Sequence, residues 1–154
     1  MEANGALTQI ASQEEPTVAV ALIGLRYDCW RCHEVSTPLV GLLEVGGDVY
    51  SEEFVACDDE LVLAFAWENL PLEARTRWRV GEVRERFSKT SQKAYLSNGC
   101  ASCGALFGEF PLIHEALPEA LATEGLTSLI ELAVVELADA AWTEIFESRW
   151  NYAE

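Results

Sequence analysis

Two Cys-x-x-Cys motifs, Cys29–Cys32 and Cys100–Cys103, constrain this chain of 154 residues more than any other feature. A Cys-x-x-Cys turn places two sulfur atoms on the same side of a tight loop, where both can bind one ion. Zn²⁺ prefers four tetrahedral ligands, and thiolates are favoured at structural sites. We therefore predict that Cys29, Cys32, Cys100 and Cys103 bind one structural Zn²⁺ ion.

The 67 residues between Cys32 and Cys100 are too many for a single short zinc ribbon. We interpret them as an insertion of several strands between the two halves of a split ribbon. Gly99 and Gly104 flank the second motif, where a tight turn calls for positive φ. Four reduced and buried cysteines would be the alternative, but two pairs of identical spacing disfavour it.

Two other chemistries use the same spacing. The run from Cys29 to His33 matches the Cys-x-x-Cys-His pattern of covalent haem attachment, which requires export, and residues 1–16 show no secretory signal. A thioredoxin-like redox pair needs a thiolate at a helix N-terminus, whereas Cys29 lies between predicted strands. Outside the motifs, Cys57 is interpreted as a core cysteine and His114 as a surface histidine.

Composition favours a folded protein without a membrane span. Half of the residues are apolar, and no window approaches ~18 consecutive apolar residues. With no export signal we expect a cytoplasmic protein, where thiols stay reduced and bind metal rather than form disulfides. We expect residues 1–16 to form a flexible arm and residues 17–154 a single domain.

Apolar patterning predicts an α+β fold of mostly antiparallel strands. Strands are expected from Thr17 towards Cys29 and at 38–45, 49–56, 61–67, 93–97 and 105–113, with 38–56 forming a hairpin. A short helix is expected from Pro71 to Trp78, capped by Asn69.

The C-terminal segment has the spacing of a long amphipathic helix. Ser128 and Glu131 match a capping box, and apolar residues recur at helical spacing from Ile130 to Ile145. We predict about six helical turns ending near Trp150.

The sequence around the cysteines resembles a loosely defined group of uncharacterised bacterial proteins with split zinc-ribbon knuckles. The resemblance covers residues 25–113 and runs through Tyr27-x-Cys29-Trp30-x-Cys32, Asn69-Leu70-Pro71, Phe87-Ser88-Lys89-Thr90 and Tyr95-x-x-Asn98-x-Cys100-x-x-Cys103-Gly104-Ala105-x-x-Gly108-Glu109-Phe110. It implies that the four cysteines are metal ligands and that Tyr95 and Asn98 support the second knuckle. The group has no established activity.

Charge favours binding of a basic protein. The net charge is −16, which attracts basic partners and repels nucleic acid. No nucleotide-binding glycine motif or nucleophile elbow is present, so an enzyme is not expected. We expect a non-catalytic acidic protein that neutralises a basic, toxin- or nuclease-like protein, as immunity proteins and inhibitors do. The candidate contacts are Glu52, Glu53, Asp58, Asp59, Glu60, Trp150 and Tyr152.

The alternative is a zinc-ribbon protein that binds nucleic acid or has a regulatory role. Residues 73–93 hold seven of the ten basic side chains, interleaved with aromatic residues. These seven are Arg75, Arg77, Arg79, Arg84, Arg86, Lys89 and Lys93.

Overall fold

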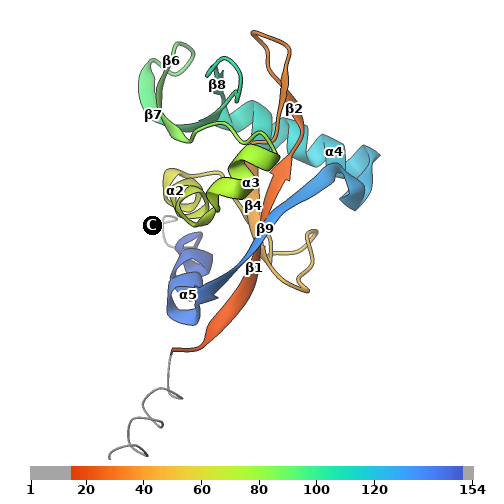
Figure 1. The fold of residues 1–154 in the computed structure, drawn as a ribbon, viewed down its shortest axis with the longest axis vertical. Coiled ribbons are helices and arrows are strands. Elements are labelled where there is room, and N and C mark those ends of the chain that lie inside the picture. Colours follow the sequence, from red (N-terminus) through yellow and green to blue (C-terminus); the bar gives the residue numbers. More distant parts are fainter. Residues whose placement is uncertain (1–14, 151–154) are drawn as a thin grey trace, which may run out of the picture.

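A computed structural model describes residues 15–150. At its centre lies a four-stranded antiparallel sheet in the order β5-β4-β1-β9. Its strands are β1 (Thr17–Leu25), β4 (Leu39–Glu44), β5 (Val55–Ala56) and β9 (Leu129–Ala138). Strands β1 and β9 pair along their length and lie side by side in Figure 1.

Side chains of β1 alternate between two apolar clusters, one on each face of this sheet. Val20 and Leu22 belong to the first cluster, and Ala21 and Ile23 belong to the second. Successive side chains of a strand point to opposite faces, so a strand that is apolar at nearly every position needs a cover on both sides. The central sheet is therefore buried between two layers.

Helices supply both layers (Figure 1). The first cluster is closed by α2 (Glu60–Asn69), α3 (Leu72–Arg77) and α5 (Asp139–Ser148). The second is closed by η1 (Phe110–Ala116), which has the wide turns of a π-helix, and by α4 (Leu117–Thr123). A short 3₁₀ turn, η2 (Gly125–Ser128), leads into β9.

A smaller assembly at one end of the molecule carries the cysteines (Figure 1). It consists of a three-stranded antiparallel sheet in the order β6-β7-β8 and of the pair β2-β3. These strands are β2 (Tyr27–Asp28), β3 (Val35–Ser36), β6 (Arg84–Ser88), β7 (Lys93–Gly99) and β8 (Leu106–Phe107). A third, small apolar cluster lies between them and contains Cys29, Cys100, Ala105 and Phe107.

The buried side chain of Asn98 ties this assembly to the central sheet. Its Oδ1 accepts a hydrogen bond from the Leu39 N–H (3.1 Å), and its Nδ2 donates to the Leu39 carbonyl (2.9 Å). The end of β7 is thus fixed to the start of β4 at Asn98, two residues before Cys100 begins the second turn.

The fold is mixed α and β with mostly antiparallel sheets, as predicted. The strands predicted from Thr17, near 38–45 and at 93–97 are present, and the short helix predicted from Pro71 is α3. The predicted hairpin over 38–56 is a pairing of β4 with β5, whose second strand has only two residues. Residues 1–14 of the predicted arm, and Tyr152, lie outside the described residues.

The predicted long C-terminal helix is wrong. Residues 129–138 form β9, and only Asp139–Ser148 is helical. The register with β1 shifts between Leu22 and Ile23, so that Leu132 is an extra residue in β9. Because of this bulge, Leu132 and Leu137, which are five positions apart, enter the same apolar cluster. The sequence of β9 therefore lacks the alternating apolar pattern typical of a strand.

The predicted strand at 61–67 is also wrong, because this segment lies in α2. The Asp59 carboxylate accepts a hydrogen bond from the Val62 N–H (2.9 Å) and caps the helix. Asn69 does not cap the next helix: it is the last residue of α2, and its Nδ2 donates to the Phe65 carbonyl (2.9 Å). Pro71 takes the N-cap position of α3.

The predicted strand at 105–113 extends only over Leu106–Phe107. Pro111 has no N–H to donate to a sheet and suits the first turn of a helix, and η1 begins at Phe110. In residues 15–150, no helix is both long and apolar enough to span a membrane.

Candidate metal centre

Four cysteine sulfur atoms from the two motifs meet at one point. The Cys29 and Cys103 Sγ atoms lie 3.6 Å apart, those of Cys32 and Cys100 lie 3.5 Å apart, and all four lie within 4.8 Å of one another. Four sulfur atoms at ~2.3 Å from a tetrahedral Zn²⁺ ion would be separated by ~3.8 Å. The cluster predicted from the motif spacing is confirmed, and its dimensions fit one metal ion.

Each turn directs two backbone N–H groups at the sulfur of its first cysteine. The Cys29 Sγ accepts from the N–H groups of Arg31 (3.3 Å) and Cys32 (3.4 Å). The Cys100 Sγ accepts from the backbone N–H groups of the residues two and three positions after it, at 3.3 and 3.4 Å. Such hydrogen bonds stabilise the thiolate relative to the thiol, and the thiolate is the form that binds a metal.

The two turns also close in the same way. His33 N–H donates to the Cys29 carbonyl and Gly104 N–H to the Cys100 carbonyl, each at 3.0 Å. Both donors have a left-handed backbone, with φ of 68° and 78°. His33 therefore occupies the position that glycine occupies in the second turn, and it is not part of the four-sulfur cluster.

Crowding of the four thiols makes their ionisation interdependent. Burial raises the pKa of the Cys100 thiol, but the N–H groups of Cys103 and Ser102 lower it further, to about 6. At Cys32, a backbone hydrogen bond at Glu34 lowers the pKa, while burial and the neighbouring thiols raise it to about 12. Four negative charges at these distances repel strongly, and a divalent cation removes that repulsion.

Side chains of the first turn and of β3 join the first half of the site to the second half. Trp30 is largely exposed, and its Nε1 donates to the Leu106 carbonyl (2.8 Å). The buried Ser36 hydroxyl accepts from the Ala101 N–H (2.8 Å) and lies 3.8 Å from the Cys100 Sγ. The two halves of the split site therefore form one unit.

Several side chains of the basic segment bond within the chain. The Arg75 guanidinium donates to the Leu70 and Trp67 carbonyls at 3.0 and 2.7 Å and stacks on the Trp67 ring at 3.6 Å. Arg84 pairs with the Glu82 carboxylate at 3.5 Å. The exposed members of the set are Arg77, Arg79, Arg84, Lys89 and Lys93.

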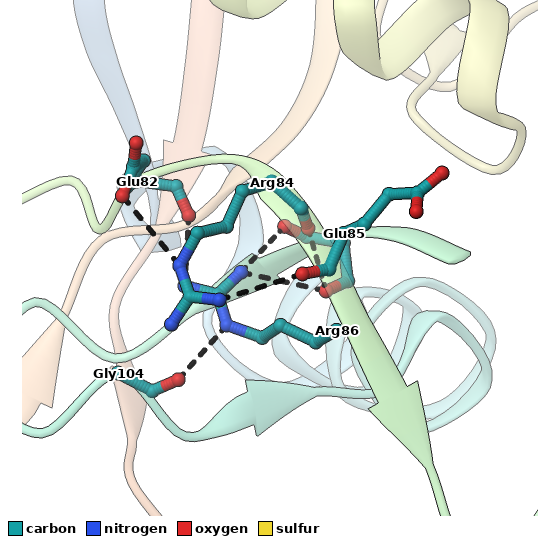
Figure 2. Close-up of polar contacts among 6 residues, drawn as sticks. Glu82, Arg84, Glu85, Arg86 and Gly104 are labelled. Carbon is teal, nitrogen blue, oxygen red and sulfur yellow. Dashed lines mark hydrogen bonds and ion pairs between the residues drawn. The ribbon is translucent and has the colours of Figure 1, made fainter. Parts of the chain in front are cut away.

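Arg86 is buried beneath the second turn (Figure 2). Its guanidinium donates to the carbonyls of Gly104 (2.8 Å), Ser97 (2.9 Å) and Glu82 (2.9 Å). Burial lowers its pKa. Arg79 reaches the same turn. The motif spacing gave no sign of these contacts, because they depend on how β6 packs against the turn.

Gly99 is required for a reason other than the predicted one. Positive φ is found at Gly104 but not at Gly99. A Cβ atom at Gly99 would overlap the Arg86 guanidinium, so this group packs directly on the Gly99 backbone. The glycine before Cys100 therefore permits close approach of Arg86.

The predicted acidic contacts divide between two places, and several stabilise local structure. Glu53 accepts from the Asp48 N–H (2.8 Å) in the turn after β4, and Glu60 accepts from the Leu96 N–H (2.7 Å). Asp59 caps α2. The remaining described candidates are Glu52, Asp58 and Trp150, of which Glu52 and Trp150 are exposed.

The other two singled-out residues have ordinary surroundings. Cys57 is buried in the first apolar cluster, where burial raises the pKa of its thiol. His114 is exposed and lies 3.2 Å from the Glu109 carboxylate.

Comparison with protein families finds no family model that matches this chain. Searches of curated proteins and of solved structures likewise give no significant match. The four-cysteine cluster is therefore the feature from which a function can be inferred.

Proposed function

We propose that Cys29, Cys32, Cys100 and Cys103 bind one Zn²⁺ ion with a structural role. The observation that carries this proposal is the approach of all four Sγ atoms to within 4.8 Å in two turns of matching hydrogen-bond pattern. Soft thiolate ligands suit Zn²⁺, and four of them leave no position for a reacting water molecule.

The ion would stabilise the part of the molecule with the smallest core. The cluster around Cys29 and Cys100 contains only four buried residues, whereas the two clusters on the central sheet are larger. The nearest sulfur pairs join residues 74 and 68 positions apart in sequence. Binding free energy of a structural ion adds directly to the stability of such a region.

Zinc analysis of matched cysteine variants tests this proposal. The wild-type protein should contain one zinc per chain, and Cys100→Ser should lose it together with several kcal/mol of unfolding free energy. Cys57→Ala removes a buried thiol outside the cluster and should retain one zinc per chain. A folded wild-type protein without metal, or a Cys100→Ser variant with unchanged zinc content and melting temperature, would contradict the proposal.

We further propose that the protein is non-catalytic and docks on a basic protein partner, as an immunity or inhibitor protein does. The net charge of −16 supports this, together with the internal use of Arg75 and Arg86. Carboxylates that face a basic partner accelerate association, and a metal-held scaffold loses little entropy on binding.

Association kinetics with a partner recovered by affinity capture test the second proposal. The association rate should fall more than tenfold between ~50 and ~300 mM salt. Glu52→Gln with Glu53→Gln should slow association, whereas Glu119→Gln with Glu124→Gln, which removes the same charge from exposed sites near α4, should have little effect. Salt-independent association, or a specific gel shift with nucleic acid at physiological salt, would contradict an acidic docking surface.

A further inference from the structure

Three guanidinium groups converge on the second cysteine turn. Each donates a hydrogen bond to an acceptor at or beside Cys103. These acceptors are the Cys103 carbonyl for Arg31 (2.8 Å), the Ser102 hydroxyl for Arg79 and the Gly104 carbonyl for Arg86 (2.8 Å). The three arginines come from the first turn, from the segment after α3 and from β6.

None of the three has a carboxylate partner within residues 15–150. The ion pairs closer than 4.0 Å in this part of the chain join Arg84 to Glu82 and His114 to Glu109. Arg86 is 8 % exposed and is hydrogen-bonded only to neutral acceptors, and the Glu82 carboxylate acts on its charge without forming an ion pair closer than 4.0 Å. A buried charge is stabilised by opposite charge nearby, so an anion at the cysteine turn would add to the effect of Glu82 on this arginine.

A zinc ion bound by four thiolates is such an anion, with a net charge of −2. We propose that Arg31, Arg79 and Arg86 compensate this charge and thereby set the metal affinity of the site. The inference rests on the proposed zinc centre and assigns to these arginines a role in holding its ion. They act through the turn, because their donors contact its backbone and the Ser102 hydroxyl rather than sulfur.

Further hydrogen bonds of Arg79 and Arg86 hold their guanidinium groups in place. The Arg79 Nε donates to the Val35 carbonyl (3.0 Å), just after the first turn, so Arg79 bridges both halves of the site. Arg86 lies directly on Gly99 and is held by three carbonyls. Figure 2 shows its hydrogen bond to the Gly104 carbonyl. Guanidinium groups fixed in this way face the site without a large loss of side-chain entropy on metal binding.

Zinc affinity measured by competition with a chromophoric chelator tests the role of charge. Loss of an outer contact to a metal ligand typically weakens metal binding 10- to 100-fold. Arg31→Gln and Arg79→Gln should each weaken zinc binding about tenfold, and the double variant more than either. Arg79→Lys keeps the charge and should retain most of the affinity. Arg77→Gln is the control, because Arg77 is exposed and its guanidinium lies over the Trp78 ring.

Cobalt substitution separates compensation of charge from support of the fold. Removing a positive charge near a thiolate raises the energy of its electrons, so the sulfur-to-cobalt charge-transfer band of Arg79→Gln should move to longer wavelength. Arg79→Lys and Arg77→Gln should keep the wild-type band. Equal zinc affinities for Arg31→Gln, Arg79→Gln and Arg77→Gln would overturn the inference, as would an Arg79→Lys variant as weak as Arg79→Gln. A wild-type protein that binds no zinc would instead refute the centre itself.

Discussion

His33 and Gly104 occupy equivalent positions, one residue after the second cysteine of each turn, with φ of 68° and 78°. Their N–H groups make the same 3.0 Å hydrogen bond to the carbonyl of the first cysteine. A left-handed backbone costs a residue with a Cβ atom about 1–2 kcal/mol. The first turn therefore contains strain that the second turn avoids.

Relief of this strain gives the first prediction. His33→Gly should raise the unfolding free energy of the zinc-loaded protein by about 0.5–1 kcal/mol and leave its zinc content unchanged. Gly104→Ala should lower it by about 1 kcal/mol or more, because the same conformation then becomes strained. Denaturant unfolding measures both effects. Loss of zinc from His33→Gly would show that the histidine is a ligand after all.

Removal of the metal should affect the two ends of the molecule differently. The clusters on the central sheet contain none of the four cysteines, whereas the third cluster contains Cys29 and Cys100. A strong chelator should therefore abolish amide hydrogen-exchange protection in β2, β3 and β8 while β1 and β4 stay protected. Equal loss of protection in β1 would mean that the ion stabilises the whole fold.

Substitutions of the two neighbouring aspartates at the start of α2, Asp58 and Asp59, should change the stability of the protein in opposite directions. Burial, and then the Asp59 carboxylate, raise the pKa of Asp58 above its ordinary value of 3.8. The folded protein therefore keeps the Asp58 proton to a higher pH than the unfolded chain does. Ionisation of Asp58 thus costs stability once the pH exceeds the ordinary pKa of 3.8. Asp58→Asn should raise stability at pH 7 by a few tenths of a kcal/mol, allowing for solvent screening, and the gain should vanish below pH ~4.

Asp59→Ala is the comparison for this pair. It removes the hydrogen bond that caps α2 and should cost about 1 kcal/mol at pH 7. Thermal unfolding at several pH values measures both variants. A stabilising effect of Asp59→Ala, or a pH-independent effect of Asp58→Asn, would contradict these assignments.

The side-chain amide of Asn98 should make a large contribution to the free energy of unfolding. Asn98→Leu would leave the N–H and carbonyl of Leu39 without their side-chain partners in a buried place, at a cost of about 2–4 kcal/mol. Asn69→Ala loses one hydrogen bond at the end of α2 and should cost about 1 kcal/mol or less. Denaturant unfolding compares the two. Equal costs would show that Asn98 does not anchor the cysteine assembly.

Features set by local chemistry could be predicted from the sequence. Two motifs of identical spacing predict the cluster of four cysteines because each turn is formed by four consecutive residues. The strand from Thr17 could be predicted because its β-branched and apolar residues suit a buried strand. The short helix after Pro71 could be predicted because proline suits a helix start.

Features set by long-range packing could not be predicted from the sequence. The spacing of Ile130 to Ile145 fits a helix, but β1 offers a partner over nine residues, and pairing with it outweighs local preference. In α2, buried residues share the helix with partly buried Phe65 and Trp67, so no helical stripe was visible. The contacts of Arg79 and Arg86 depend on segments that are distant in sequence from Cys103.

The order of the cysteine turns along the chain limits when metal can be enclosed during synthesis. Cys29 and Cys32 leave the ribosome long before their partners, and both stay accessible to oxidants or chaperones until Cys103 has been added. Strand β9, the edge strand that completes the central sheet, is made later still. A metal ion held by all four cysteines could therefore be enclosed only after Cys103 has been made.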